Sequence, residues 1–489
     1  MSAIPKVARR DTHVLIVGAG LTGSLTCYHL RAMAGKRTPP LRIDVADMAR
    51  GPGGRMSTTR FGPDSIRANT GAQYLSAFSH EAAAMLETVG APSSACPTDR
   101  VPDPLKRSTH FTLHPDDDYT HWLPRKGTNA AVKQFLYGGA PDLVVFESRL
   151  QRMAVDPTSA RPRLVPLFDS GGTTSEYDVV IFAMPPKDIV KFFNDDRLDA
   201  QSQADLHRRT NRGRSTPLPR NHQSVVLPSD VLSKLRAPSY VGRYSLAVWF
   251  EDAKFANEAA RAWSSRRDPH PILDMVSSQD GGVLVAQSTV ELWRRLNNNR
   301  GGGRGGAKAE IVGALEGLAG SEMPRARNTK LLNWRTSQAR AAGDGVVTAD
   351  GGRLVFTGDW CFESSFEGCN LAAQAAATAT VNAIISLDST IERDAVVGGG
   401  ARAPAVAPAR SSTPPPTTAA PSAARSEGRG HIGGEKRPAP APSGEEGGKV
   451  CSGPCGETLP RSKFSKTQWT KPERSGRCKD CVAASTNPG

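Results

Sequence analysis

Apolar and polar residues follow one another in blocks that predict strands, glycine turns and helices. Residues 14–17 form a continuous apolar run, which is typical of a buried parallel strand. A turn with Gly18, Gly20 and Gly23 follows and predicts the start of a helix. A second apolar run, residues 41–46, ends at Asp47. Strand, glycine turn, helix, strand and acid occur here in the order of a Rossmann-type dinucleotide site.

The residue types of this segment suit a pyrophosphate. Gly18 permits a tight turn, Gly20 lets the backbone approach the phosphates, and Gly23 lets the helix pack closely on the strand. The free N–H groups at the helix start favour an anion, and Asp47 is placed to bond a ribose hydroxyl. Glycine turns are common by themselves, so the whole order of elements carries the prediction.

A second glycine turn selects between cofactors. Gly53-Gly54-Arg55-Met56 follows Asp47 closely, and flavoenzymes of the amine oxidase class carry Gly-Gly-Arg at this place. Arg55 suits phosphate because a guanidinium forms paired, charge-assisted hydrogen bonds. The alternative interpretation is a basic surface turn. We therefore expect FAD as the cofactor.

Further runs predict the rest of the folded body. Strands are expected near residues 143–146, 179–185, 244–251, 282–288 and 354–359, with the first two buried. Residues 368–387, rich in Ala and Thr, predict a buried helix against the cofactor domain. The polar residues 199–222 and the Asn- and Gly-rich residues 297–306 predict flexible insertions.

The amino-acid composition separates a folded body from a linker within the chain of 489 residues. Residues 397–449 contain no aromatic residue, Leu or Met, so they cannot bury enough apolar surface to fold and predict a disordered linker. The net charge of +14 is widely spread, which favours solvated loops over a polyanion site. The chain has no apolar run of membrane-spanning length. No signal-peptide core is visible, so we expect an intracellular, cytoplasmic protein, with an organelle as the alternative.

Several motifs in order resemble the renalase family, flavoproteins of the amine oxidase superfamily. The matching stretches are residues 14–25, 53–56, 70–74, 243–250, 333–339, 358–360 and 366–369. The resemblance covers about residues 12–390 without the two insertions. It implies an α/β fold with a Rossmann-type FAD-binding domain and a second, α+β substrate domain. It also implies oxidation of aberrant dihydro isomers of NAD(P), with hydride passing to the flavin and then to oxygen as hydrogen peroxide.

The resemblance carries roles to individual positions. The implied cofactor contacts are Gly18, Gly20, Gly23 and Asp47 for the adenosine and pyrophosphate, Gly54, Arg55 and Met56 for the second cradle, Gln73 beside the isoalloxazine, and Gly358 and Asp359 at the ribityl-phosphate portion. Tyr74 and Trp334 are the candidate catalytic residues, with a core aromatic as the alternative for Trp334. The helix after Glu367 would direct its N-terminus at the flavin. Asn69 departs from the family, which usually has an acid there.

Other classes of function stay open. Monoamine oxidases flank the flavin with two tyrosines, and one of those places is Ser365 here, so the aromatic cage for an amine is incomplete. We therefore rank a dihydropyridine oxidase above an amine oxidase. A carotenoid-desaturase-like enzyme ranks third, because the chain lacks a visible membrane-docking segment. A non-enzymatic scaffold that holds FAD and recruits partners is the remaining alternative.

The tail carries a separate motif. Cys451, Cys455, Cys478 and Cys481 form two close pairs with a finger-length insert, a pattern that suits tetrahedral zinc. Disulfides are the alternative. Residues 464–469 resemble the Stc1-type zinc module of fungal heterochromatin factors. Residues 451–489 hold seven Lys/Arg and three Asp/Glu, and four thiolates with one Zn²⁺ leave a charge of about +2. That charge is small for nucleic acid, so we expect a protein partner.

The predicted organisation is an oxidoreductase body, a linker and a zinc module. The body is residues 1–390, with FAD-binding segments at about 12–80, 140–190 and 350–390 and a substrate domain at about 81–139 and 223–349. The disordered linker is residues 397–449 and the module is residues 450–485. The expected partners are a small-molecule substrate and oxygen, with no membrane.

Overall fold

The computed structural model divides the chain into two compact units, Met1–Ala403 and Pro404–Gly489. It describes residues 11–35, 38–61, 66–88, 95–96, 120–122, 127–158, 162–169, 175–193, 221–266, 268–279, 281–298, 303–340, 345–398, 449–450 and 458–459. In the second unit, β19 (Lys449–Val450) pairs with β20 (Thr458–Leu459) in antiparallel fashion. The four tail cysteines, residues 399–448 of the predicted linker and residues 199–220 of the predicted insertion lie outside the described residues.

A six-stranded sheet organises the first unit. Its order is β17-β18-β11-β1-β2-β8, with parallel pairing throughout except for β17 at one edge. The strands are β1 (Thr12–Val17), β2 (Leu41–Ala46), β8 (Leu143–Val145), β11 (Val179–Ala183), β17 (Val347–Ala349) and β18 (Leu354–Thr357). Regions far apart in the sequence thus build one sheet, which confirms the predicted Rossmann-like architecture.

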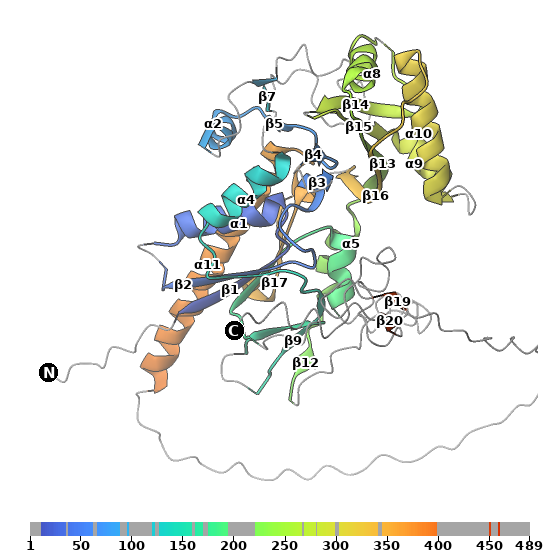
Figure 1. Cartoon of the computed structure of the whole chain (residues 1–489). Coiled ribbons are helices and arrows are strands. Elements are labelled where there is room, and N and C mark those ends of the chain that lie inside the picture. Colours follow the sequence, from blue (N-terminus) through green and yellow to red (C-terminus); the bar gives the residue numbers. More distant parts are fainter. Residues whose placement is uncertain are drawn as a thin grey trace, which may run out of the picture. The chain divides into compact units, whose positions relative to one another are not determined.

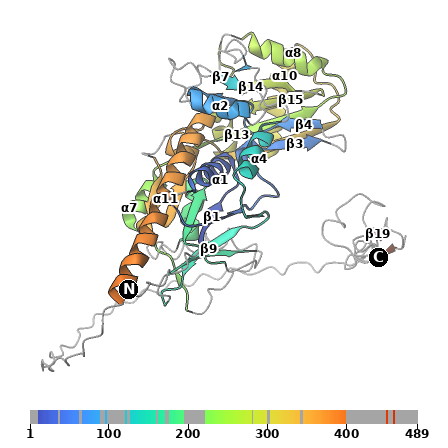
Figure 2. The ribbon, with the colours of Figure 1, turned by 90° about the vertical axis from the view of Figure 1, so that its left-hand side faces the viewer.

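Helices cover this sheet (Figure 1), and apolar side chains of α1 (Leu21–Met33), α4 (Thr128–Gly138) and α11 (Phe366–Gly398) join those of the strands in one buried cluster. Helix α1 begins directly after Gly20, and α11 packs along it (Figure 2). Helix α4 also packs on α1. Residues 128–138 therefore belong with the six-stranded sheet and its helices, although the sequence predicts them in the substrate domain, because the apolar side of α4 packs on α1.

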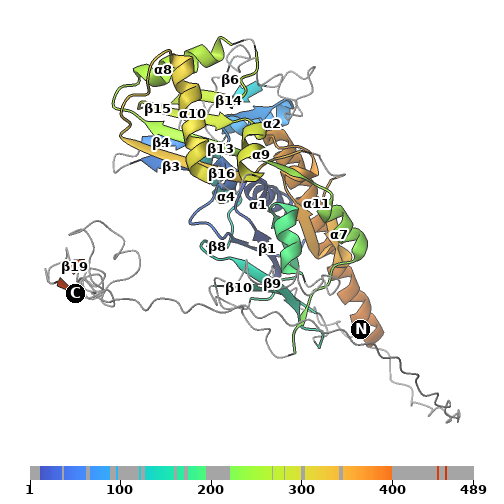
Figure 3. The same ribbon diagram turned by 90° about the vertical axis from the view of Figure 1, so that its right-hand side faces the viewer.

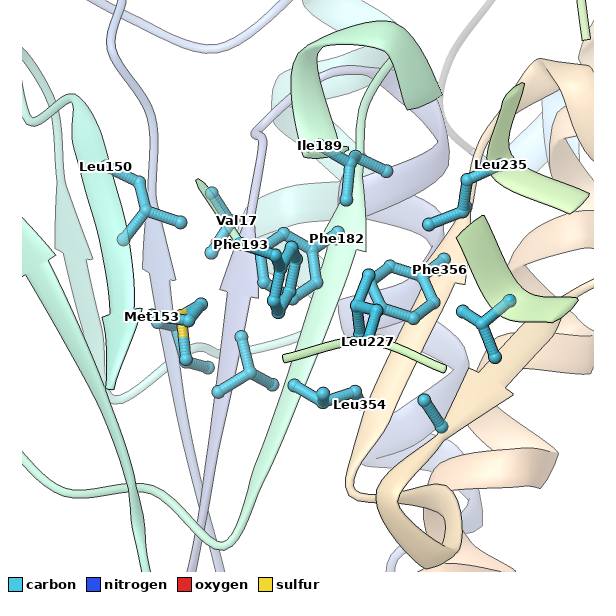
Figure 4. Close-up of a cluster of buried hydrophobic side chains, with 14 of the residues drawn as sticks. Val17, Leu150, Met153, Phe182, Ile189, Phe193, Leu227, Leu235, Leu354 and Phe356 are labelled. Atoms are coloured by element: carbon cyan, nitrogen blue, oxygen red, sulfur yellow. The ribbon is translucent and has the colours of Figure 1, made fainter. Parts of the chain in front are cut away.

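A cluster of buried side chains joins the sheet to its neighbouring elements (Figure 4). Phe182 on β11 and Phe356 on β18 stack with their ring centroids 5.3 Å apart. Leu150 and Met153 contribute from β9 (Leu150–Val155), and Leu235 from α7 (Ser229–Arg236). Each fully buried side chain of this size stabilises the fold by about 1.5–3 kcal/mol. The cluster therefore fixes the carboxyl ends of β11 and β18, where a Rossmann ligand binds.

Strand β8 differs from its prediction as a buried strand. Leu143 is 39% exposed and Val145 is 37% exposed. The reason is its place at the edge of the sheet beyond β2, which sequence periodicity does not reveal.

A four-stranded antiparallel sheet forms a second layer, in the order β14-β15-β13-β16. Its strands are β13 (Tyr240–Trp249), β14 (Leu273–Gln279), β15 (Val283–Ser288) and β16 (Asn328–Ala339). One face packs against α8 (Lys254–Ser264), α9 (Val290–Asn298) and α10 (Gly303–Ala319) (Figure 3). On β13, Tyr244 and Leu246 join that core while Ala247 packs on Phe61 at the other face. Arg243 has the parity of Ala247, which directs it away from the helices.

The predicted flexible insertion at residues 297–306 is partly wrong. Helix α9 continues to Asn298 and α10 begins at Gly303. The two helices pack on each other here, and a Cβ on Gly306 would make an ordinary van der Waals contact of 3.8 Å with the Leu296 side chain. Burial of Ala307, Ile311 and Leu315 on one helical face then stabilises α10 in spite of its glycines.

Short elements complete the first unit. They are η1 (Gly54–Met56), β3 (Thr58–Phe61), β4 (Ile66–Asn69), β5 (Leu75–Ala77), α2 (His80–Thr88), β6 (Ala95–Cys96), β7 (Thr120–Trp122), β10 (Leu164–Phe168), α5 (Pro186–Ile189), η3 (Val190–Phe192), β12 (Gln223–Ser224), η4 (Asp350–Gly352) and η5 (Asp359–Cys361). Of the helices that the structure describes, none has both the length and the apolar character needed to cross a lipid bilayer.

Candidate functional site

One cavity of about 1120 Å³ gathers the residues predicted for the FAD-binding body. Its lining includes Gly18, Gly20, Asp47, Gly54, Arg55, Met56, Gln73, Tyr74, Trp334, Gly358 and Asp359. The cavity exceeds the roughly 300–1,000 Å³ of common small-molecule pockets. It extends from the carboxyl ends of the parallel strands to residues of β13–β16, so it has room for a dinucleotide and a second ligand.

The three glycines of the first turn have different structural reasons. Gly18 has φ of 112°, and a Cβ there would lie 2.6 Å from the Ala183 carbonyl oxygen. A Cβ on Gly23 would lie 1.9 Å from the Gly18 carbonyl oxygen, so Gly23 serves helix packing and is absent from the cavity lining. Gly20 lines the cavity and has no atom within 4 Å of such a Cβ. The space beside Gly20 is therefore open for a ligand.

Asp47 links the end of β2 to the glycine turn. Its Oδ2 accepts a hydrogen bond of 2.7 Å from the Ala19 N–H, and Oδ1 accepts one of 2.7 Å from the Ala49 N–H. A carboxylate has about four lone-pair sites. Asp47 therefore holds the turn and retains acceptor capacity toward the cavity.

Arg55 is committed to a protein carboxylate. Its Nη1 lies 2.5 Å from Asp359 Oδ2 and its Nη2 lies 2.6 Å from Asp359 Oδ1, a bidentate ion pair. The guanidinium also lies 5.4 Å from the ring centroid of Tyr240. This geometry joins η1 to η5 across the cavity. The sequence placed Arg55 at the pyrophosphate and did not foresee this pairing.

Asp359 sits in a dense network of donors. The Tyr240 hydroxyl donates to Oδ1 over 2.8 Å, and the Ser364 hydroxyl donates to Oδ2. Burial raises the pKa of Asp359, but the charge of Arg55 and the hydrogen bonds from Arg55, Ser364 and Tyr240 outweigh it, so the net pKa is lowered. Burial and the neighbouring Asp359 also raise the pKa of Tyr240. The network therefore holds an ionised Asp359 beside a neutral Tyr240.

Gln73 connects the segment after β4 to the four-stranded sheet. Its Nε2 donates to the Asn69 carbonyl over 2.5 Å, and its Oε1 accepts from Ser277 Oγ over 2.6 Å. The Asn69 Oδ1 accepts a hydrogen bond of 3.1 Å from the Thr128 N–H at the start of α4. A neutral side chain thus fulfils the acceptor role there.

The N-terminus of α11 faces the cavity, with Ser365, Phe366 and Cys369 in the lining. Ser365 Oγ accepts from the Gly368 N–H over 2.9 Å, which is the geometry of a helix cap. The serine at this amine-cage position therefore has a structural role. Burial raises the pKa of the Cys369 thiol to about 12, so it stays neutral.

The opposite wall comes from the four-stranded sheet. Trp334 on β16 donates its indole N–H to the Thr70 carbonyl over 2.9 Å and lines the cavity. Its partner across the ladder is Arg243 on β13, which is only 3% exposed. Burial lowers the pKa of Arg243 to about 10, which leaves it charged at neutral pH. Arg243 forms an ion pair with Asp274 of β14.

Sequence reasoning missed this Arg243–Asp274 pair. Arg243 stands within a motif that resembles the family, but no role followed from it. An arginine inside an otherwise apolar strand is a signal that could have found it, since a buried charge requires a partner. Asp274 has no comparable local signal. Among the residues that the structure describes, no group of three or more His, Cys, Asp or Glu could hold a metal ion.

A comparison with protein-family models matches the segment that contains both glycine turns. Residues 16–89 match the family model described as an NAD(P)-binding Rossmann-like domain. No curated protein matches the chain. Among solved structures, the chain is similar to a putrescine oxidase double mutant redesigned in its cofactor binding, at 14% identity and TM-score 0.47, covering 77% of this chain and 100% of that one. It is also similar to cyclohexylamine oxidase from Brevibacterium oxydans, at 12% identity and TM-score 0.48, covering 78% of this chain and 100% of that one.

Proposed function

We propose that the chain is an FAD-dependent oxidase of the renalase type, which oxidises a reduced pyridine nucleotide isomer. The observation that carries the proposal is the single cavity that joins the Rossmann glycine turn, the second glycine turn and a wall of the substrate sheet.

The cavity fits the proposed cofactor. Gly20 leaves space for a pyrophosphate at the start of α1, where free N–H groups favour an anion. Asp47 retains acceptor capacity for a ribose hydroxyl. Gln73 and Tyr74 line the same cavity toward the substrate sheet. When bound, FAD supplies a ring that accepts a hydride and returns the electrons to oxygen as hydrogen peroxide.

The charged residues of β13–β16 that line the cavity favour binding of a neutral ring over binding of an ammonium ion. Among the described residues of β13–β16 that line the cavity, the one carboxylate is Asp274, and Arg243 already neutralises it. A protonated amine would approach the Arg243 guanidinium without a carboxylate of its own. The incomplete aromatic cage at Ser365 also disfavours an amine substrate.

The proposed reaction requires positioning more than acid–base chemistry. Removal of a hydride from a dihydropyridine leaves an aromatic pyridinium, so no general base is needed. Trp334 offers a flat wall and the Gln73 network fixes the loop that carries Tyr74. The chain therefore contributes orientation and exclusion of water.

Anaerobic flavin bleaching tests this proposal. The purified protein is mixed with dihydro-NAD(P) isomers or with amines such as putrescine and cyclohexylamine, and absorbance of the oxidised flavin is followed. We expect rapid bleaching by at least one dihydropyridine isomer and slower or no bleaching by the amines. Rapid bleaching by an amine with none by the isomers would instead identify an amine oxidase. A flavin that none of them reduces would favour the scaffold.

We also propose, from sequence alone, that the tail binds one zinc ion through Cys451, Cys455, Cys478 and Cys481. The spacing of two close cysteine pairs supports this proposal. The small positive charge of residues 451–489 favours a protein partner over nucleic acid.

A further inference from the structure

We propose that Arg243 and Asp274 act together as the recognition site for a primary carboxamide on the substrate ring. This inference rests on the proposed function and states which group of the substrate is recognised by the part of the four-stranded sheet that lines the cavity. The two side chains line the cavity and form an ion pair with each other. The side chain of Arg243 is 4% exposed and that of Asp274 is 18% exposed.

Irregularities of the sheet lie next to both members of the pair. The register between β14 and β15 shifts between Leu273 and Met275, so Asp274 is the extra residue of a bulge. The register between β13 and β16 shifts between Val241 and Arg243. Bulges re-aim side chains and are frequent next to active sites. Asp274 and Met275 both line the cavity, while Leu273 and Val276 on either side of them lie in the core against the helices, so the extra residue lets two adjacent side chains face the cavity.

Arg243 is held in place and still has donors to offer. Its Nη1 donates to the Ser288 carbonyl over 3.0 Å, and its Nη2 donates to Gln338 Oε1 over 3.2 Å. With the Asp274 ion pair, these partners occupy about three of the five N–H groups of a guanidinium. The fixed guanidinium therefore presents remaining donors at the cavity wall.

The pair matches the hydrogen-bonding pattern of a carboxamide. Arg243 can only donate and Asp274, when ionised, can only accept. A primary carboxamide offers one carbonyl acceptor and an amino group with two donors. A carboxylate ligand would meet repulsion from Asp274, and an ammonium ligand would meet repulsion from Arg243. Trp334, opposite Arg243 in the ladder, adds a flat surface for the ring.

Binding of three pyridines tests the inference without turnover. Nicotinamide, nicotinate and 3-aminomethylpyridine share one ring and differ in a neutral, an anionic and a cationic substituent. Each is titrated into the FAD-loaded protein, with the flavin absorbance shift and calorimetry as readouts. We expect nicotinamide to bind at least about tenfold tighter than the other two, because hydrogen bonds to charged groups discriminate by that factor or more.

Substitutions of Asp274 and Arg243 should shift the relative affinities of the three ligands in opposite directions. Asp274→Asn should favour nicotinate, and Arg243→Gln should favour 3-aminomethylpyridine. Since either single change leaves a buried charge, the double variant R243Q/D274N keeps the net charge and should lose the preference among the three ligands. Asp169→Asn removes another carboxylate of the cavity lining and should leave the order unchanged.

The outcomes separate the inference from the proposed function. If dihydropyridine isomers bleach the flavin but D274N and the double variant keep the wild-type ligand order, the carboxamide site is wrong and the oxidase stands. If no isomer bleaches the flavin but D274N shifts preference from nicotinamide to nicotinate, the recognition site stands and the proposed oxidation is wrong.

Discussion

Asp359 shows how one residue can join the second glycine turn to the four-stranded sheet. Its carboxylate receives two hydrogen bonds from Arg55 and one each from Tyr240 and Ser364. These four donors match the roughly four lone-pair sites of a carboxylate. Asp359 is thus engaged on all sides by this chain, and it holds Arg55 at the cavity wall.

Asp359→Asn should lower the free energy of unfolding at neutral pH by about 3 kcal/mol. This is the lower end of the range for breaking a buried ion pair, because the Arg55 side chain is 31% exposed. Tyr240→Phe is the matched control, since it removes one hydrogen bond to the same carboxylate and should cost about 1 kcal/mol. Urea unfolding measures both.

The pH dependence of this difference follows from the lowered pKa of Asp359. A carboxyl with a lowered folded-state pKa contributes its full stabilisation above its ordinary value of 3.8 and loses it as the pH falls through the lowered value. The difference between wild type and Asp359→Asn should therefore persist from pH 7 down to about pH 4. A difference that vanishes by pH 5 would contradict an ionised Asp359 in the network.

At the scale of elements, the sequence could predict those features that depend on residues adjacent in the chain. The segment from β1 through α1 to β2 was predicted with its glycine turn because neighbouring residues encode it. The exposure of β8 depends on its place at the sheet edge, and the helical start of α10 depends on contacts with α9. Such contacts join residues that no short window contains.

In the candidate site, too, some residues could be predicted from local motifs, while the contacts between distant residues could not. The glycines, Asp47 and Arg55 could be found from motifs, and the structure brings them to one cavity with Tyr74 and Trp334. The pairing of Arg55 with Asp359 joins residues 304 positions apart in the chain. The Arg243–Asp274 pair joins β13 to β14, which are not neighbours in the sheet, so no local motif predicts it.

At the scale of the whole molecule, the cavity belongs to the first unit as far as the structure describes it. The described lining residues fall between Val17 and Cys369, within the unit Met1–Ala403. A chain that ends after Ala403 should therefore keep its FAD and its turnover. The full chain should contain about one zinc per chain by metal analysis, and the truncated chain none.

Two results would contradict the assignment of FAD binding and turnover to the first unit and of zinc binding to the tail. Loss of turnover in the truncated chain with FAD still bound would show that the tail completes the active site. Absence of zinc from the full chain, with disulfides between the tail cysteines under reducing conditions, would contradict the proposed metal module.

The most direct test of the central claim is the FAD content of a matched pair of glycine variants. Gly20 and Gly313 both have open space where a side chain would begin, with no atom within 4 Å of an added Cβ, but only Gly20 lines the cavity. Flavin released on denaturation should amount to about one FAD per chain in wild type and in Gly313→Val, and to almost none in Gly20→Val. Full FAD occupancy in Gly20→Val would contradict the account.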